Sequence, residues 1–246
     1  MKQILTLLLL VFSVPLLALR VELSNDTFAT TGRAANRNLF VTNNSEKMIA
    51  LEVYAQSRQV DAVTGIDELE DIEDFLIYPN QLLLQPDEQQ VVTLTWVGAQ
   101  ELTEEQAFRI IVEELNLSLG DDEGEDDDMT VKLAALTKVV KAAYVAPDGA
   151  KSNVEVSNVE VVENDDDEKI IRITLSNSGT AHKILKQTEI TLTPMNDGKK
   201  VTDAAKVYVP DALNGVINIL AKSDRVIDLD WPEDISSSTQ AFDVSL

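Results

Sequence analysis

Residues 129–147, MTVKLAALTKVVKAAYVAP, begin with a strict alternation of side chains. Met129, Val131, Leu133 and Ala135 fall on one face of an extended chain, which predicts a β-strand with one apolar face. A helix is the alternative, because alanine, leucine and lysine are good helix formers. An apolar row of this kind suits β-augmentation, in which main-chain hydrogen bonds join a strand to another chain. An ordinary core strand is the plainer interpretation.

Short apolar runs separated by turn residues recur before this stretch and predict further strands. These strands are Leu19–Leu23, Asn38–Thr42, Met48–Ala55, Phe75–Tyr78, Gln81–Gln85, Gln89–Val97 and Gln106–Leu117. Pro79 and Pro86 stand between strands, where proline is tolerated. Residues 65–75 differ, because apolar side chains recur there at steps of three with acids between them. We expect one or two helical turns, or a solvated loop, in that segment.

A second series of short β-type runs follows the turn-rich segment PDGAKSN at residues 147–153, which we interpret as a linker. The runs are Val154–Val162, Lys169–Ser176, Ala181–Pro194, Ala205–Val209, Val216–Ala221, Arg225–Leu229 and Ala241–Leu246. The spacing of short strands is typical of antiparallel sandwiches. The sequence therefore predicts an all-β protein with two domains, residues 19–147 and 148–246.

The first 18 residues have the pattern of a secretory signal peptide. Lys2 precedes an apolar run at 4–17, and the small residue Ala18 offers a cleavage point. The run is shorter than a membrane span requires. We therefore expect an exported, soluble chain without membrane insertion.

Charge and cysteine content narrow the function classes. The chain has 43 acidic and 20 basic side chains, a formal net charge of −23. Removal of residues 1–18, with Lys2 as their charged side chain, makes it more negative still. Such a surface argues against partners such as nucleic acid or anionic lipid. Export permits disulfides, but the chain has no cysteine, so the core alone must hold the fold.

Motifs for catalysis or metal binding are not found in the sequence. The single histidine, His182, fits a packing or hydrogen-bonding role better than catalysis. The acidic runs 121–128 and 165–168 do not match the spaced ligands of a calcium loop. Glu113 and Glu114 point to opposite faces of a strand and cannot easily act together as acid and base. We expect no enzymatic activity, no cofactor and no metal site.

Several short motifs together cover nearly the whole mature chain. They are VTNNS at 41–45, PNQLLLQP at 79–86 followed by Gln90 and Val92, FRIIVEEL at 108–115, YVAP at 144–147 and NSGTAH at 177–182. In this order they resemble the periplasmic chaperones of chaperone–usher pilus assembly, and the last two resemble its archaic branch. The resemblance implies two immunoglobulin-like β-sandwich domains in tandem. It also implies a periplasmic protein that binds pilin subunits and delivers them to an outer-membrane usher.

The resemblance assigns roles to residues of the alternating stretch. The last strand of the first domain would complete the unfinished fold of a pilin. The donor residues are then Val131, Leu133 and Ala135, with Met129 at the edge. Burying a side chain such as Leu133 contributes roughly 1.5–3 kcal/mol.

The family also anchors the terminal carboxylate of the subunit with basic side chains. This chain has Asn25 and Thr93 where relatives have arginine, which leaves Lys141, Lys138 and Arg109 as candidate anchors. An ammonium beside a carboxylate forms a charge-assisted hydrogen bond. Surface lysines that keep an acidic protein soluble are the alternative.

Other functions remain open at the level of sequence. The main alternative is a structural or adhesive extracellular β-sandwich protein, and a more remote one is a calcium-dependent hydrolase or binding module. An exposed donor strand also leaves self-association of the free protein open. Leu133→Asp distinguishes the first alternative, because only a strand donor loses a partner when its apolar row is charged.

Overall fold

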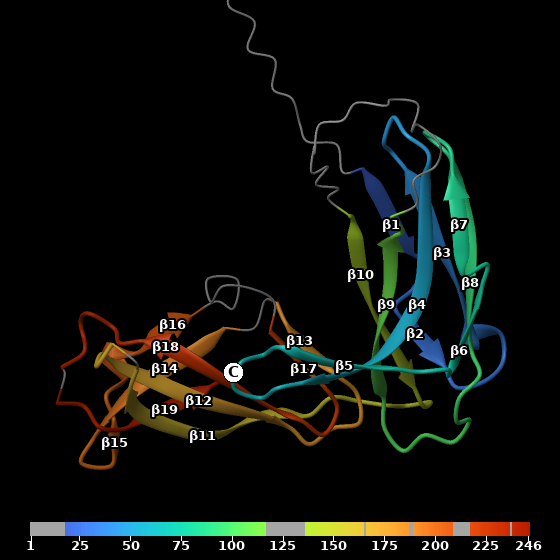
Figure 1. Cartoon of the computed structure of the whole chain (residues 1–246). Coiled ribbons are helices and arrows are strands. Elements are labelled where there is room, and N and C mark those ends of the chain that lie inside the picture. The colour runs from blue at the N-terminus through green and yellow to red at the C-terminus, as the bar shows by residue number, and fades with distance from the viewer. Residues whose placement is uncertain (1–17, 117–135, 165, 187–188, 209–216, 237) are drawn as a thin grey trace, which may run out of the picture.

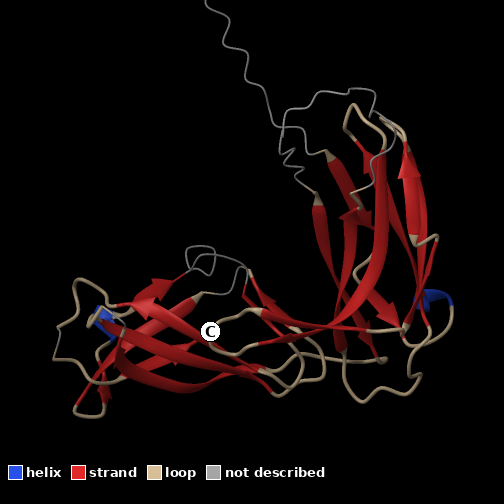
Figure 2. Cartoon of the chain, in the orientation of Figure 1, coloured by secondary structure: helices blue, strands red, loops and turns tan. Residues whose placement is uncertain are grey.

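The structure, a computed structural model, describes residues 18–116, 136–164, 166–186, 189–208, 217–236 and 238–246. Its strands form two lobes, which we call the N-terminal lobe (residues 19–146) and the C-terminal lobe (residues 154–245) (Figure 1). Among the described residues, helical structure is limited to the 3₁₀ turns Arg33–Ala35 and Thr202–Ala204 (Figure 2). The predicted fold class, two immunoglobulin-like β-sandwich domains in tandem, is confirmed. The boundary near residue 147 stays a prediction.

The N-terminal lobe is built from two sheets. One has the strand order β1 (Leu19–Leu23), β3 (Asn36–Asn43), β8 (Gln89–Trp96) and β6 (Phe75–Tyr78), all antiparallel. The other has the order β2 (Thr27–Ala29), β10 (Lys138–Ala146), β9 (Gln106–Glu114), β4 (Ile49–Val60) and β5 (Asp67–Asp71), and β7 (Gln81–Leu84) also pairs with β4. The strand interpretation of residues 138–146 is therefore correct, and the helical alternative is wrong there.

The core of this lobe is formed by alternate residues of both sheets, as the period of two predicts. The Phe75 ring lies at its centre and meets the rings of Phe28, Trp96 and Phe108 edge-on, at centroid distances of 5.2, 5.3 and 5.3 Å. Such aromatic pairs each contribute about 0.5–1.5 kcal/mol beyond their buried area. These contacts tie β2, β6, β8 and β9 together.

Part of the segment at residues 65–75, which was expected to form helical turns or a loop, is instead a strand, β5 (Asp67–Asp71). β5 pairs antiparallel with β4, with Val60 opposite Asp67 and Gln56 opposite Asp71. The apolar spacing of three was misleading because Leu69 is exposed and packs no core. Backbone pairing with a long neighbouring strand decides the conformation of this acidic segment. In Figure 1 the β4–β5 hairpin leaves the N-terminal lobe and reaches the C-terminal lobe.

The C-terminal lobe contains several smaller sheets. They are β11 (Val154–Glu163), β12 (Lys169–Asn177) and β18 (Asp224–Asp230); β13 (Lys183–Leu185) and β17 (Ile217–Ile219); and β14 (Ile190–Asn196) with β15 (Lys199–Lys200), β16 (Lys206–Tyr208) and β19 (Phe242–Ser245). The run expected at 181–194 therefore holds two strands, β13 and the start of β14. Inward-facing Ile171, Ile173 and Leu175 of β12 are fully buried in the core.

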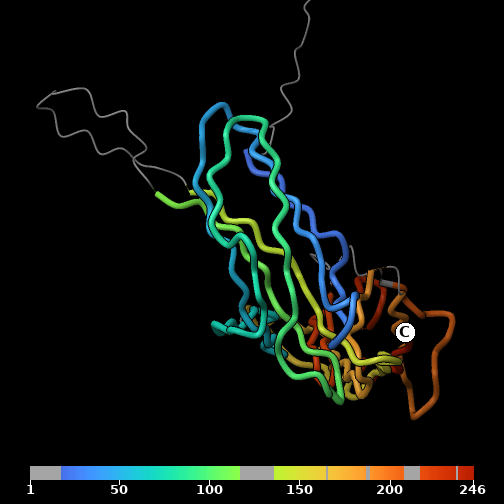
Figure 3. Tube along the Cα trace, turned by 90° about the vertical axis from the view of Figure 1, so that its right-hand side faces the viewer, coloured from blue at the N-terminus to red at the C-terminus, as the bar shows by residue number. Residues whose placement is uncertain are grey.

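The linker at 147–153 joins the lobes next to the end of β10. The view in Figure 3 shows the N-terminal lobe as an elongated sandwich, with the C-terminal lobe at one of its ends. The strand that resembles a donor strand therefore runs along one lobe and ends where the other begins.

Candidate functional site

β10 has a free edge over most of its length. It pairs with β9 from Lys138 to Val145, but on its other side β2 pairs with Tyr144–Ala146 alone. Within the described residues, Lys138–Ala143 thus have a strand neighbour on one side only. An unpaired row of N–H and C=O groups is a ready template for a further strand.

The side chains of β10 alternate between two environments. Val139, Ala143 and Val145 pack in the core of the N-terminal lobe. On the other face, Val140 is 45 % exposed, and Leu136 just before the strand is 49 % exposed. Apolar groups thus stay accessible beside the free edge.

The four predicted donor residues lie outside the described residues. Met129, Val131, Leu133 and Ala135 precede Leu136, where the described chain resumes. Their role stays a prediction. The predicted run therefore leads directly into the free edge of β10.

Lys138, one of the predicted anchors, is engaged within its own lobe. Its Nζ donates to Tyr54 Oη (3.0 Å) and lies 3.3 Å from Glu113 Oε2, and the Tyr54 hydroxyl donates to the same carboxylate (2.5 Å). The Tyr54 and Lys138 hydrogen bonds hold the pKa of Glu113 below its usual value. The contact with Tyr54 also raises the pKa of Lys138. The charge of Lys138 is therefore balanced by Glu113.

Arg109 is also paired, within a cluster that the sequence did not reveal. Its guanidinium binds Asp67 Oδ2 (2.5 Å), while Arg58 Nε donates to Asp67 Oδ1 (2.8 Å). Burial raises the pKa of the Asp67 carboxyl, but the bonds and charges of Arg58 and Arg109 outweigh it and keep that pKa low. Two guanidinium groups share one carboxylate, so the cluster carries a net positive charge.

Arg58 is the most buried member of this cluster. Its side chain is 7 % exposed, and its Nη1 atom is buried without a hydrogen-bond partner among the described residues. Arg58 and Asp67 were missed because their meeting depends on the β4–β5 pairing, and that segment was expected to be helix or loop. Alternation along β4 places Arg58 on the same face of the strand as Tyr54, and this pattern is the signal in the sequence that could have pointed to Arg58.

Lys141 differs from the other two predicted anchors. It is half-buried on β10, opposite Ile110 of β9. It has no hydrogen-bond or ion-pair partner among the residues that the structure describes. Of Lys141, Lys138 and Arg109, it alone keeps its donors available.

The end of β10 lies against the C-terminal lobe. Tyr144 is buried, its ring stacks on His182 with a centroid distance of 3.8 Å, and its Oη accepts from Asn218 Nδ2 (2.7 Å). Burial raises the pKa of Tyr144. Glu105 Oε1 meets His182 Nδ1 at 2.7 Å and accepts from its backbone N–H at 2.9 Å. The packing and hydrogen-bonding role predicted for His182 is confirmed.

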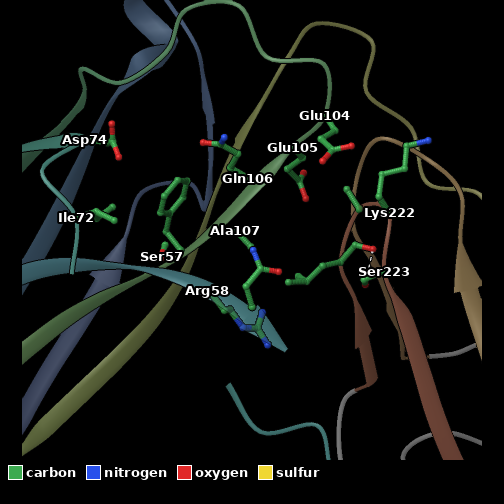
Figure 4. Close-up of a pocket in the computed structure, with 14 residues that line it drawn as sticks. Ser57, Arg58, Ile72, Asp74, Glu104, Glu105, Gln106, Ala107, Lys222 and Ser223 are labelled. Carbon is green, nitrogen blue, oxygen red and sulfur yellow. Dashed lines mark hydrogen bonds between the residues drawn. The ribbon is translucent and has the colours of Figure 1, made fainter. Parts of the chain in front are cut away.

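A cavity of about 440 Å³ lies between the lobes beside this junction. Arg58 comes to it from β4, Glu104 and Glu105 from the segment before β9, and Lys222 and Ser223 from the turn before β18 (Figure 4). Across the described ranges, no group of three His, Asp or Glu side chains is placed to hold a metal ion. The same residues contain no helix long and apolar enough to cross a membrane.

Solved structures share this arrangement, although no protein-family profile and no curated protein sequence matches the chain. A chain of the CsuC–CsuE chaperone–tip adhesion subunit pre-assembly complex, from the archaic chaperone-usher Csu pili of Acinetobacter baumannii, superimposes with a TM-score of 0.56 at 13 % identity. The match covers 92 % of this chain and 97 % of that chain. The chain has the pilus-chaperone fold.

Two further structures support the same fold. In the complex of the Salmonella enterica SafA pilin with the SafB chaperone, the TM-score is 0.52 at 12 % identity, covering 88 % of this chain and 86 % of that one. For the YadV chaperone it is 0.52 at 13 % identity, covering 93 % and 91 %. The resemblance inferred from the sequence motifs is thus confirmed as a likeness to pilus chaperones.

Within the pilus-chaperone fold, three of the motifs lie at strand ends and turns, whereas PNQLLLQP contains β7 and FRIIVEEL lies along β9. VTNNS closes β3, NSGTAH follows β12, and YVAP ends β10 at the linker. VTNNS, YVAP and NSGTAH thus mark corners of the fold, while Arg58, Asp67 and Glu105 come from positions between motifs.

Proposed function

We propose that this chain is a periplasmic chaperone of pilus assembly that binds pilin subunits by donating a strand. The observation that carries the proposal is the free edge of β10, which follows directly on the alternating residues Val131, Leu133 and Ala135. The chaperone–pilin and chaperone–tip adhesin complexes among the structural neighbours favour this class of partner. The chain acts by binding, without covalent catalysis.

Strand addition gives a role both to the free edge of β10 and to the alternating residues that precede it. The unpaired N–H and C=O groups of β10 form hydrogen bonds with a subunit strand, whatever its sequence. Val131, Leu133 and Ala135 have the same parity in sequence as Val139, and their side chains fill the groove of the subunit. Alternate side chains give such interfaces their specificity. Removing an unpaired edge and an open groove from solvent also protects the subunit from aggregation.

Lys141 is the cation that anchors the terminal carboxylate of the subunit. Lys138 and Arg109 are paired with Glu113 and Asp67, so binding a carboxylate there first requires an existing ion pair to break. Lys141 requires no such exchange. Lys141→Ala is therefore expected to lower subunit affinity by about tenfold, in keeping with a lost charge-assisted hydrogen bond. Lys138→Ala is expected to have a smaller effect, measured by titration with purified subunit.

Export by the signal peptide at residues 1–18 brings the chaperone to the periplasm, and the bound subunit passes to an outer-membrane usher. The exchange at the usher needs a complex that is stable but reversible. A donor row with one large residue, Leu133, and the small Ala135 fits that requirement, because each buried CH₂ contributes only about 0.8 kcal/mol.

Affinity capture from periplasmic extract of the source cell tests the proposal. The tagged wild type is compared with Leu133→Asp and with Val91→Asp, a control on the exposed face of β8 in the other sheet, where Val91 is 42 % exposed. We expect small β-rich secreted subunits with the wild type and with Val91→Asp, and none with Leu133→Asp. Equal capture by all three proteins contradicts strand donation and favours a structural or adhesive β-sandwich.

A further inference from the structure

β10 is held differently at its two ends. Tyr144 and Val145, near its C-terminal end, pair with β9 on one side and with β2 on the other. Lys138–Ala143 pair with β9 alone among the described strands. An edge segment of this kind can slip along its neighbour by one residue if a bulge before the fixed end absorbs the difference. The register of this segment therefore depends on its contacts with β9 and with the strands beyond it.

Apolar side chains do not fix this register. Val139 and Ala143 face the core, with the half-buried Lys141 between them, while Val140 on the opposite face is 45 % exposed. A slip by one residue turns every side chain of a strand to the other face. It would bring Val140 and Ala142 toward the core and carry Lys141 away from it. The slipped register thus buries apolar groups similar to those of the observed register.

A polar contact marks the register at the start of the strand. Lys138 stands opposite Glu113 of β9, and its Nζ lies 3.3 Å from Glu113 Oε2. The same Nζ reaches past β9 to β4, where it donates to Tyr54 Oη (3.0 Å) and lies 5.6 Å from the centre of that ring. The Tyr54 hydroxyl donates in turn to Glu113 Oε2 (2.5 Å). One side chain of β10 is thereby joined to β9 and to β4 at once.

The backbone next to Lys138 keeps the same register. Glu114 N donates to Thr137 O (2.9 Å), and Thr137 N donates to Glu114 Oε2 (3.1 Å). Thr137 therefore stands opposite Glu114, as Lys138 stands opposite Glu113. A slip by one residue would turn Lys138 to the face away from Glu113 and would break these contacts together.

A weak contact is sufficient for this purpose. The Lys138 and Glu113 side chains are 47 % and 37 % exposed, and an exposed ion pair adds little to the stability of a whole protein. The choice between two registers needs less, because both retain similar backbone pairing and bury similar apolar groups. A single polar side chain sets the register of coiled coils in the same way. A small free-energy difference at Lys138 can therefore select one register of β10.

We propose that Lys138, Glu113 and Tyr54 are positioning residues that fix the register of β10 on β9. The proposal gives Lys138 a role other than that of a carboxylate anchor. The alternating residues 131–135 come just before Lys138 in the chain. The register at Lys138 thus sets the face toward which they turn when a subunit binds. This last consequence rests on the proposed function, whereas the register of the free protein does not.

Disulfide trapping in the absence of subunit tests this proposal. The chain has no cysteine, so pairs of introduced cysteines report on register without interference. Val140→Cys with Ile111→Cys reports the observed register, because these two residues stand opposite each other. Val140→Cys with Ile110→Cys or with Val112→Cys reports a slip in either direction, because Ile110 and Val112 face the core, away from Val140. Two cysteines form a disulfide only when their Cβ atoms face each other.

Variants of the three residues are compared with each pair of cysteines. Lys138→Ala and Glu113→Gln are expected to raise the rate at which the slipped pairs cross-link by about tenfold, because the population of the slipped register rises. Tyr54→Phe is expected to have a smaller effect in the same direction. Lys138→Arg keeps a cation within reach of Glu113 and is expected to keep the rate of the parent.

Glu52 of β4 provides a matched control. It stands opposite Glu113 in the same row of the sheet, and among the described residues no ion pair joins it to Lys138. Glu52→Gln is therefore expected to leave every cross-linking rate unchanged. Circular dichroism verifies that each variant is folded. If Lys138→Ala does not fold, Lys138→Met, which keeps the aliphatic part of the side chain, is measured in its place.

The proposal is overturned if the folded Lys138 and Glu113 variants trap the slipped register no faster than the parent. Faster trapping in Glu52→Gln also overturns it, because the effect then follows from any charge lost in that row. Subunit affinity is titrated separately, and Lys138→Ala is expected to lower it by about twofold or less, since only the slipped fraction of the protein loses its ability to bind. Because trapping is recorded without subunit, it stands or fails independently of strand donation by Leu133.

Discussion

Asn43 in the N-terminal lobe and Asn177 in the C-terminal lobe end the equivalent strands β3 and β12, and both are buried. The two N–H groups of each side-chain amide are shared among three backbone carbonyls within hydrogen-bond distance. The partners of Asn43 are Lys47 O (2.7 Å), Leu84 O (3.1 Å) and Gln85 O (3.0 Å); those of Asn177 are Ala181 O (2.8 Å), Ile219 O (3.3 Å) and Leu220 O (2.9 Å). In both cases the first partner lies four residues after the asparagine.

The similarity extends to the turn before the neighbouring strand of each sheet, which is β8 in the N-terminal lobe and β18 in the C-terminal lobe. Asn43 N donates to Glu88 O, and Asn177 N donates to Ser223 O, both at 2.9 Å. The residues before these acceptors, Asp87 and Lys222, both have positive φ, 62° and 54°. The two lobes thus contain the same corner, built around a buried asparagine.

The corners differ in what their turns do next. In the C-terminal lobe, the turn after Asn177 continues into Thr180 and His182, which bind Glu105 of the other lobe. It also binds the linker, because Thr180 N donates to Lys151 O (2.7 Å). In the N-terminal lobe, the turn after Asn43 contacts its own lobe, because Asn44 N donates a hydrogen bond to Ala18 O. One corner stabilises a lobe, and the other also joins two lobes.

Removing the amide from either corner is expected to have the largest effect. Asn43→Ala and Asn177→Ala each leave three carbonyls without their donor, so we expect the free energy of unfolding to fall by about 3 kcal/mol or more. Tryptophan fluorescence during denaturation reports on each lobe, because Trp96 lies in the N-terminal core and Trp231 in the C-terminal lobe. Trp231→Phe and Trp96→Phe backgrounds isolate the two signals.

The outcome of that experiment sharpens the comparison. Asn177→Ala is expected to disturb lobe orientation as well as stability, whereas Asn43→Ala lowers stability alone. Lobe orientation is followed by the distance between two spin labels, one attached to each lobe, and equal changes in that distance with both variants contradict the joining role of the second corner.

The next effect comes from the second residue after each asparagine. Ser45 and Gly179 are equivalent, since the backbone N–H of each donates to the asparagine Oδ1 (2.9 and 3.0 Å). A Cβ on Gly179 would lie 2.3 Å from Lys151 O of the linker. We therefore expect Gly179→Ser to cost about 2 kcal/mol in the denaturation of the C-terminal lobe, and Ser45→Gly to cost less than about 1 kcal/mol in the N-terminal lobe.

The expected difference between Gly179→Ser and Ser45→Gly depends on the close approach of Gly179 to the linker. If Gly179→Ser is as mild as Ser45→Gly, the linker does not depend on close approach to the turn. The C-terminal corner then has no special requirement for glycine.

A smaller effect is expected from ion pairs that differ in burial. Asp67 lies between Arg58 and Arg109 in the N-terminal lobe, while Asp228 binds Arg172 in the C-terminal lobe, where both side chains are more exposed. We expect Asp67→Asn to lower the free energy of unfolding by about 1–2 kcal/mol at neutral pH. For Asp228→Asn we expect less than about 1 kcal/mol.

The pH dependence gives the sign of the Asp67 contribution. Its pKa in the folded protein lies below the ordinary value of 3.8. Its stabilisation is therefore complete above that value and is lost as the pH falls through the lower, folded-state pKa. The difference between wild type and Asp67→Asn is expected to shrink in acid denaturation series below about pH 4. A difference that stays constant on acidification contradicts the ion-pair account.

Much of the fold was predictable because alternation is a local property. β8 and β9 carry buried side chains at every second position, so their pattern survives without knowledge of their neighbours. β5 was predicted wrongly because its acids and exposed Leu69 follow no core face. Its strand state depends on pairing with β4, which the local sequence does not encode.

The site was predictable only in part, for the same reason. The resemblance to pilus chaperones singled out Lys138, Lys141 and Arg109. It did not indicate that Lys138 pairs with Glu113 or that Arg109 pairs with Asp67. Glu105 and His182 stand 77 positions apart, and their contact follows from how two sandwiches meet. The donor residues lie outside the described residues, so their role stays a prediction.

Amide hydrogen exchange along β10 tests the central claim most directly. A subunit isolated by the capture experiment is added to the wild-type protein, and exchange is followed at Lys138–Ala143. Strand donation predicts that amides of this free edge slow by about tenfold or more when the subunit binds, because they gain hydrogen-bond partners. Amides of β8, in the other sheet, are expected to stay unchanged. A bound subunit that leaves exchange along Lys138–Ala143 unaltered contradicts the claim that β10 is the strand that pairs with it.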